Sequence, residues 1–131
     1  EQRSLGKPIA YLVNKKQFWD SEFFITCDTL IPRPDTELVV EKVLQFTKQR
    51  NKLNILDIGV GSGCILLSIL KERKNFYGTG VDISKKCLNI TKINAIGMRT
   101  YGGPEGRLMT ECFARLARPL TGLNDGAFVG L

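Results

Sequence analysis

The chain has 131 residues, a length that suits one domain with a hydrophobic core and is short for two. Apolar residues make up 43% of it, but no run of about eighteen is uninterrupted, so we expect no membrane partner. The polar N-terminus lacks the apolar segment of a signal peptide and an initiator methionine, which suggests part of a longer protein.

The formal net charge is +6, from 19 basic and 13 acidic side chains. Two interpretations stay open: a lysine-rich surface that keeps the protein soluble, or attraction to an RNA-rich partner such as the ribosome. The basic side chains are scattered rather than interleaved with aromatic ones. The charge therefore permits proximity to RNA without predicting a nucleic-acid groove.

Four isolated cysteines and the absence of histidine argue against a metal site. No two of the cysteines form a C-x-x-C pair. The ligands of a zinc site are therefore missing, and we predict no metal. Isolated cysteines without a signal sequence are typical of reduced side chains in a cytoplasmic protein. The expected location is a bacterial-type cytoplasm, with an organelle matrix as the alternative. The four are Cys27, Cys64, Cys87 and Cys112.

Two short β-rich runs predict a hairpin near the N-terminus. They are residues 8–14, which end in a polar turn, and residues 22–27. Pro32 and Pro34 then interrupt regular structure, because each proline restricts its own backbone and that of the preceding residue. We therefore expect residues 1–34 to form a linker region that contains the hairpin.

A helix is expected next, from about residue 35 to residue 49. Asp35 and Thr36 are suitable N-cap residues, because their side-chain oxygens can accept hydrogen bonds from the first free N–H groups. Apolar residues then recur near helical spacing. They are Leu38, Val39, Val43, Leu44 and Phe46.

After this helix the sequence alternates between strand and helix patterns. Residues 53–58 indicate a buried strand, a glycine-rich loop and an apolar-faced helix follow, and residues 76–81 indicate a second strand. Ser84 is expected to cap a last helix that ends near Asn94. We therefore predict that residues 35–96 form the N-terminal half of an α/β, Rossmann-like domain with a parallel sheet.

The composition changes sharply after residue 96. Residues 1–96 contain eleven lysines and eleven isoleucines, whereas residues 97–131 contain neither and include seven glycines. We interpret residues 97–131 as an atypical tail that arose by fusion, by a frameshift or at a cloning junction, or as an unusual natural segment. It is expected to add no strand, which would leave the sheet with an exposed edge. One apolar stripe is compatible with an amphipathic helix: Leu108, Met109, Cys112, Phe113 and Leu116.

The central motif is a glycine loop between two aspartates. Glycine lets the chain turn sharply from strand to helix and lets a ligand lie against bare backbone. A Cβ at Gly59 or Gly61 would fill the space that the ligand needs. Asp82, nineteen residues after the last glycine, is placed to accept hydrogen bonds from both ribose hydroxyls of an adenosine. The motif consists of Asp57, Gly59, Val60, Gly61, Ser62, Gly63 and Asp82.

The spacing distinguishes S-adenosylmethionine from a dinucleotide as the ligand. A dinucleotide-binding G-x-G-x-x-G pattern that starts at Gly59 needs glycine at position 64, where this chain has Cys64. Asp57 suits a ligand with a free amino group, such as the methionine part of S-adenosylmethionine, and would do nothing for a pyrophosphate. The sequence therefore favours an S-adenosylmethionine-dependent (class I) methyltransferase. A nicotinamide or flavin enzyme, or a loop without a ligand, are the alternatives.

Several segments around the loop narrow the family. Residues 31–37 read Ile-Pro-Arg-Pro-Asp-Thr-Glu, and residues 55–65 contain the glycine loop. Together with residues 6–11 and 81–84, they closely resemble the release-factor glutamine N5-methyltransferases, the HemK-like family. The resemblance covers about residues 3–96.

This resemblance implies an enzyme of translation termination that methylates a glutamine side-chain amide in peptide chain release factors, which are the implied partners. The cofactor would contact the glycine loop and Asp82, and Asp57 would support its amino group. The stretch of residues 32–37 would lie beside the active site, and Thr36 and Glu37 would form part of its wall, although helix capping explains these two residues equally well.

Two parts of the family pattern are absent: a small helical N-terminal domain and an Asn-Pro-Pro-Tyr loop that orients the substrate amide. An amide nitrogen is a poor nucleophile because its lone pair is delocalised, so this orientation carries much of the chemistry. The chain has five prolines and never two in succession. We therefore assign no catalytic residue and expect this chain to be inactive or weakly active. A methyltransferase for adenine or cytosine in nucleic acid, and a non-catalytic cofactor-binding fragment, are the alternatives.

Overall fold

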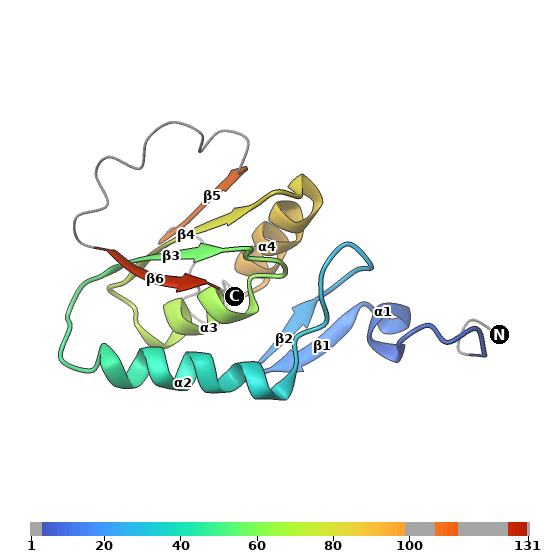
Figure 1. Ribbon diagram of the computed structural model, residues 1–131, viewed down its shortest axis with the longest axis horizontal. Coiled ribbons are helices and arrows are strands. Elements are labelled where there is room, and N and C mark those ends of the chain that lie inside the picture. The colour runs from blue at the N-terminus through green and yellow to red at the C-terminus, as the bar shows by residue number, and fades with distance from the viewer. Residues whose placement is uncertain (1–3, 99–106, 113–125, 131) are drawn as a thin grey trace.

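The computed structural model describes residues 4–98, 107–112 and 126–130. Its main body is a four-stranded parallel sheet in the order β5-β4-β3-β6, and a separate antiparallel hairpin, β1-β2, lies beside it (Figure 1). Helices α2 and α3 lie on one side of the sheet, and α3 contacts both α2 and α4. No helix in the described ranges is long and apolar enough to cross a membrane.

The N-terminal hairpin is present, but its strands differ from the predicted runs. Strands β1 (Lys15–Phe18) and β2 (Ser21–Phe24) pair around a two-residue turn. A short helix, α1 (Ile9–Val13), replaces the first predicted strand. Asn14 adopts the left-handed conformation, with φ of 54°, and ends α1. The chain therefore enters β1 at the lysines that the sequence assigned to a turn.

A 3-10 turn, η1 (Pro34–Thr36), leads directly into α2 (Glu37–Phe46). The helix is shorter than predicted, and the Thr36 side chain makes no capping hydrogen bond. The expectation of a threonine side-chain cap is therefore wrong. Thr36 has helical backbone angles, and its N–H donates to the Arg33 carbonyl at 3.0 Å, so the turn itself leads into the helix.

The strand–helix alternation after α2 is as predicted. Asp57 of the first strand faces Gly80 of the second in a parallel register. The Ser84 hydroxyl caps the last helix by accepting a hydrogen bond from the Cys87 N–H at 3.3 Å. The Rossmann-like α/β fold class is therefore confirmed for this part. The elements are β3 (Asn54–Ile58), α3 (Cys64–Glu72), β4 (Tyr77–Asp82) and α4 (Lys85–Gly97).

The tail contributes two strands that the sequence did not predict. Strand β5 (Leu108–Cys112) pairs with β4, and β6 (Gly126–Gly130) pairs with β3. The expected helix is therefore wrong over 108–112, and neither β3 nor β4 is an exposed edge. A short segment with apolar residues only at positions 108, 109 and 112 fits a strand as well as a helix, and pairing with β4 decides between them. Phe113 and Leu116 of the predicted stripe lie outside the described residues.

The core lies where α3 packs on the sheet. Helix α3 can approach closely because Gly78 of β4 has no side chain: a Cβ there would lie 2.8 Å from Leu66 and Leu70. This close packing fixes the start of α3, and therefore the glycine loop, against the strand ends. The largest buried side chains include Phe18, Phe23, Ile25, Ile55, Leu66, Leu67, Ile69, Leu70 and Phe76.

Candidate functional site

The glycine loop connects the end of β3 to the start of α3. Gly59, Gly61 and Gly63 have φ angles of 82°, 57° and 83°, in the region where L side chains are strained. The N–H groups of Gly59 and Val60 both donate to the Val81 carbonyl, at 2.8 and 3.0 Å. The loop is therefore fixed against the end of β4.

The space around the three glycines differs. A Cβ on Gly59 would meet no atom within 4 Å, and one on Gly61 would meet only the Gly59 carbonyl at 3.9 Å. A Cβ on Gly63 would lie 2.9 Å from Thr91 Cγ2 and 3.0 Å from Leu67 Cδ1. Gly59 and Gly61 thus border open space that a ligand can enter, whereas Gly63 is required by the packing of α3 against α4.

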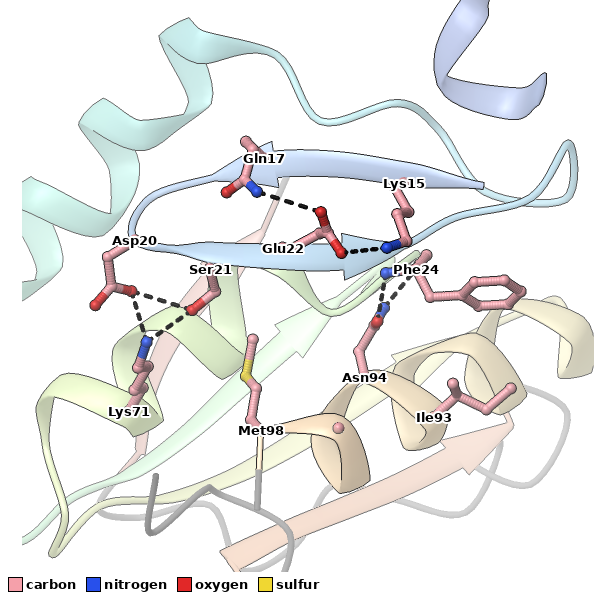
Figure 2. A pocket seen from close by; sticks show the side chains of 11 residues that line it. Lys15, Gln17, Asp20, Ser21, Glu22, Phe24, Lys71, Ile93, Asn94 and Met98 are labelled. Atoms are coloured by element: carbon pink, nitrogen blue, oxygen red, sulfur yellow. Dashed lines mark hydrogen bonds and ion pairs between the residues drawn. The ribbon is translucent and has the colours of Figure 1, made fainter. Parts of the chain in front are cut away.

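Two buried polar side chains of α4 donate hydrogen bonds to carbonyl groups of the loop. Thr91 Oγ1 donates to the Gly61 carbonyl at 2.9 Å. Asn94 Nδ2 donates to the carbonyls of Ser62, at 2.8 Å, and of Phe24 in β2, at 2.9 Å. Figure 2 shows the Asn94 side chain directed at Phe24. One helix face therefore supports both the loop and the hairpin.

Asp82 lies at the carboxyl end of β4, next to the loop, and is 8% exposed. Its Oδ2 accepts a hydrogen bond from the Gly61 N–H at 3.0 Å, and its Oδ1 accepts one from the Ser84 N–H at 2.9 Å. These two bonds orient the carboxylate. Because each carboxylate oxygen has two lone pairs, both can still accept a bond from a ligand hydroxyl.

Asp57 lies on β3, two residues before the loop, and is 3% exposed. Burial, reinforced by the negative charge of Asp82, raises the pKa of Asp57 to about 7. In the part of the chain that the structure describes, its carboxylate has no hydrogen bond or ion pair. A cationic ligand group beside it would restore its ionised form.

A pocket of about 120 Å³ lies between the loop and residues 30–36. Gly63 and Asp82 do not line it: Gly63, within the loop, faces Thr91 and Leu67, and Asp82 accepts a hydrogen bond from the Gly61 N–H. Glu37 does not line it either, because its carboxylate accepts a hydrogen bond from the Trp19 N–H at 2.7 Å. The predicted residues that do line it are Thr36, Asp57, Gly59, Val60, Gly61 and Ser62.

A larger cleft, of about 810 Å³, separates the hairpin from α4 (Figure 2). Its charged lining residues form ion pairs with one another: Lys71 Nζ lies 3.0 Å from Asp20 Oδ1, and Lys15 Nζ lies 2.9 Å from Glu22 Oε1. The cleft therefore presents little uncompensated charge to a ligand. We place the candidate site at the smaller pocket, where an acidic side chain has no described partner.

The sequence analysis missed two kinds of site residue. Thr91 supports the loop, and a buried polar stripe at helical spacing, Cys87, Thr91 and Asn94, was the available signal. The other kind completes the pocket from the proline-rich segment and the start of α3. These residues are Leu30, Ile31, Cys64 and Ile65; Pro32 and Arg33, from the stretch that the resemblance places beside the active site, also line the pocket.

Comparison with known proteins finds several relatives that carry the same name. Release factor glutamine methyltransferase of Buchnera aphidicola from Acyrthosiphon pisum is 46% identical over 94 residues, which are 72% of this chain and 34% of that protein. The proteins of the same name from Leptospira interrogans and Bacillus subtilis are 46% and 38% identical, with the same coverage of each chain. The chain thus spans about a third of the curated relatives that it matches. No family model matches it.

Solved structures agree on the fold. YjhP from E. coli superposes with a TM-score of 0.50 at 26% identity, over 63% of this chain and 31% of that one. A SAM-dependent methyltransferase from Geobacter sulfurreducens, in complex with S-adenosyl-L-homocysteine, gives 0.53 at 19% identity, over 74% and 36%. At the latter identity the likeness shows the fold alone. Along nearly three quarters of its length, the chain is therefore similar to release factor glutamine methyltransferases, and its fold is part of the Rossmann-like methyltransferase fold.

Proposed function

We propose that this chain binds S-adenosylmethionine at the glycine loop. The observation that carries the proposal is the open backbone of Gly59 and Gly61 beside the buried carboxylate of Asp57. Without side chains, the two glycines let the cofactor approach the backbone. Asp57 can accept a hydrogen bond from the ammonium group of the methionine part, and this cation would stabilise the ionised carboxylate.

The other predicted residues fit the same ligand. Asp82 keeps accepting capacity for the ribose hydroxyls, and Ile83 next to it is 85% exposed, so apolar surface is available for the adenine. Val60 and Ser62 line the pocket, and Gly63 permits the packing that positions the loop. When bound, the cofactor supplies an electrophilic methyl group on a sulfonium.

We infer that the corresponding whole protein transfers this methyl group to a glutamine side-chain amide of a peptide chain release factor. The support is the 36–46% identity to proteins of that name over residues that include the loop. The activity belongs to translation termination, in the cytoplasm and in the neighbourhood of the ribosome, which the net charge of +6 suits. Because this chain contains no Asn-Pro-Pro-Tyr sequence, we expect it to bind the cofactor and transfer little or no methyl group.

Calorimetric titration of the purified chain with S-adenosylhomocysteine tests the binding. We expect saturable binding with one site and none with a nicotinamide dinucleotide. Asp57→Asn should weaken the binding at pH 8, whereas the exposed Asp35→Asn should not. Uptake of the dinucleotide instead would overturn the proposal.

A radiolabel assay tests the activity, with release factor and RNA as separate acceptors. The Bacillus subtilis release factor glutamine methyltransferase serves as the positive control. We expect no more than trace incorporation by this chain. Robust labelling of release factor would contradict the expected inactivity, and labelling of RNA would favour a nucleic-acid methyltransferase.

A further inference from the structure

The pocket beside the glycine loop holds two side chains of opposite charge. Asp57, on β3, and the exposed Arg33, in the segment between the hairpin and α2, both line it. Every other lining residue is apolar or uncharged, including Cys64, whose thiol stays protonated because burial raises its pKa to about 11. The pocket therefore offers one cationic and one anionic group to the same ligand.

Neither charge is matched by a described partner. No hydrogen bond or ion pair of the Asp57 carboxylate or the Arg33 guanidinium occurs within the described ranges. Among the residues that the structure describes, the one charged group that shifts the pKa of Asp57 is Asp82, whose charge has the same sign. The Asp57 carboxylate is buried, and a buried carboxylate without a partner is costly, whereas Arg33 is exposed and its guanidinium is free to move. Both groups are therefore available for a ligand that carries a cation and an anion.

The backbone of Arg33 is held in one place. It lies between Pro32, which is buried, and Pro34, and it has extended angles, φ −99° and ψ 147°, as a residue before proline prefers. Its carbonyl also accepts the hydrogen bond from the Thr36 N–H at 3.0 Å. Only the side chain of Arg33 is left to adjust to a ligand.

We propose that Arg33 binds the α-carboxylate of the cofactor's methionine part, while Asp57 binds its ammonium group. The proposal rests on the proposed function and adds a residue to it. A guanidinium and a carboxylate form two parallel N–H···O bonds, and this geometry favours arginine over lysine. A ligand with a free amino-acid end satisfies both charges, whereas a pyrophosphate would satisfy only Arg33 and would repel Asp57.

Paired ligands separate this role from a general effect on the fold. S-adenosylhomocysteine has the amino-acid end, and 5′-methylthioadenosine keeps the adenosyl thioether without it. We would titrate both into the wild-type chain, Arg33→Gln, Arg33→Lys and a control, Arg50→Gln, at an exposed position outside the pocket. Loss of a charge-assisted contact should weaken S-adenosylhomocysteine roughly 10- to 100-fold in Arg33→Gln. Binding of 5′-methylthioadenosine should stay within about twofold, and Arg33→Lys should lie between wild type and Arg33→Gln.

Equal weakening of both ligands in Arg33→Gln, or no weakening of either, would overturn the role of Arg33 while leaving the cofactor assignment intact. Thermal unfolding of each variant shows whether it is folded. If Arg33→Gln does not fold, the same comparison of the two ligands is made with Arg33→Lys, which keeps the charge and most of the side-chain length, and its result tests the role of Arg33. If the wild-type chain binds neither ligand, the proposed function itself fails. The two failures are thus distinguishable.

Discussion

The Asn94 side chain hydrogen-bonds to the Phe24 backbone in both directions, as a neighbouring strand would. Asn94 Oδ1 accepts from the Phe24 N–H at 2.7 Å, and Nδ2 donates to the Phe24 carbonyl at 2.9 Å. The same Nδ2 donates to the Ser62 carbonyl at 2.8 Å. One buried amide therefore connects the hairpin, α4 and the glycine loop, and the position of the loop depends on a residue thirty-two positions away.

Asn94→Ala should destabilise the chain by about 2–4 kcal/mol, because it leaves three backbone groups without a partner. Urea unfolding, followed by circular dichroism, measures the loss. Asn89→Ala, at an exposed position on the same helix, is the control and should change stability by less than about 0.5 kcal/mol. Equal stability of the two variants would show that the amide does not hold the loop.

Gly63→Ala should cost more stability than Gly59→Ala, although both glycines have nearly the same φ. Each alanine carries the left-handed strain of about 1–2 kcal/mol. Only Gly63→Ala also places a Cβ 2.9 Å from Thr91, so roughly 1–3 kcal/mol of overpacking is added. Denaturant midpoints test the order. Cofactor binding should show the reverse selectivity, with Gly59→Ala impairing binding in a chain that still folds; identical effects of the two substitutions would contradict the different roles.

The Asp57 carboxyl should make stability fall as the pH rises from about 4 to about 7. Its pKa is raised from 3.8 to about 7 in the folded chain, so the folded state keeps a proton that the unfolded state has released. The contribution is fully present below pH 4 and is lost as the pH passes through 7. At about 1.36 kcal/mol per pKa unit, the effect is on the order of 4 kcal/mol at most.

Urea unfolding of wild type and Asp57→Asn between pH 4 and pH 8 measures this effect. The asparagine variant should lose less stability across that range than the wild type. Asp35→Asn, at an exposed position, is the matched control and should follow the wild type. A wild-type profile parallel to that of Asp57→Asn would show that Asp57 titrates alike in both states.

Arg107 connects the tail to the C-terminal end of α3. Its guanidinium donates to the carbonyls of Leu70, Arg73 and Phe76, at 2.7, 2.7 and 3.0 Å. The carbonyls at a helix end lack partners within the helix and carry partial negative charge, so a cation there is favourable. Arg107→Ala should therefore cost about 1–3 kcal/mol in urea unfolding. Arg50→Ala, at an exposed position, is the control, and an unchanged midpoint for Arg107→Ala would show that the tail does not stabilise α3.

The sequence predicted the elements whose patterns are local. The strand–loop–helix unit around Gly59, the second strand that ends at Asp82, and the Ser84 cap all follow from short-range hydrophobic periodicity, glycine placement and capping chemistry, and the structure contains each of them. These features need no knowledge of distant neighbours. The glycines with positive φ angles were identifiable for the same reason, because a tight turn between strand and helix requires glycine at that spacing.

Tertiary contacts decided the rest. The segment Leu108–Cys112 became a strand because β4 offers a parallel partner. The raised pKa of Asp57, and the pocket that Asp57 and Arg33 both line, arise from segments far apart in the sequence. Burial, strand pairing and through-space charge act between residues that a local pattern does not relate, so only the folded chain could determine them.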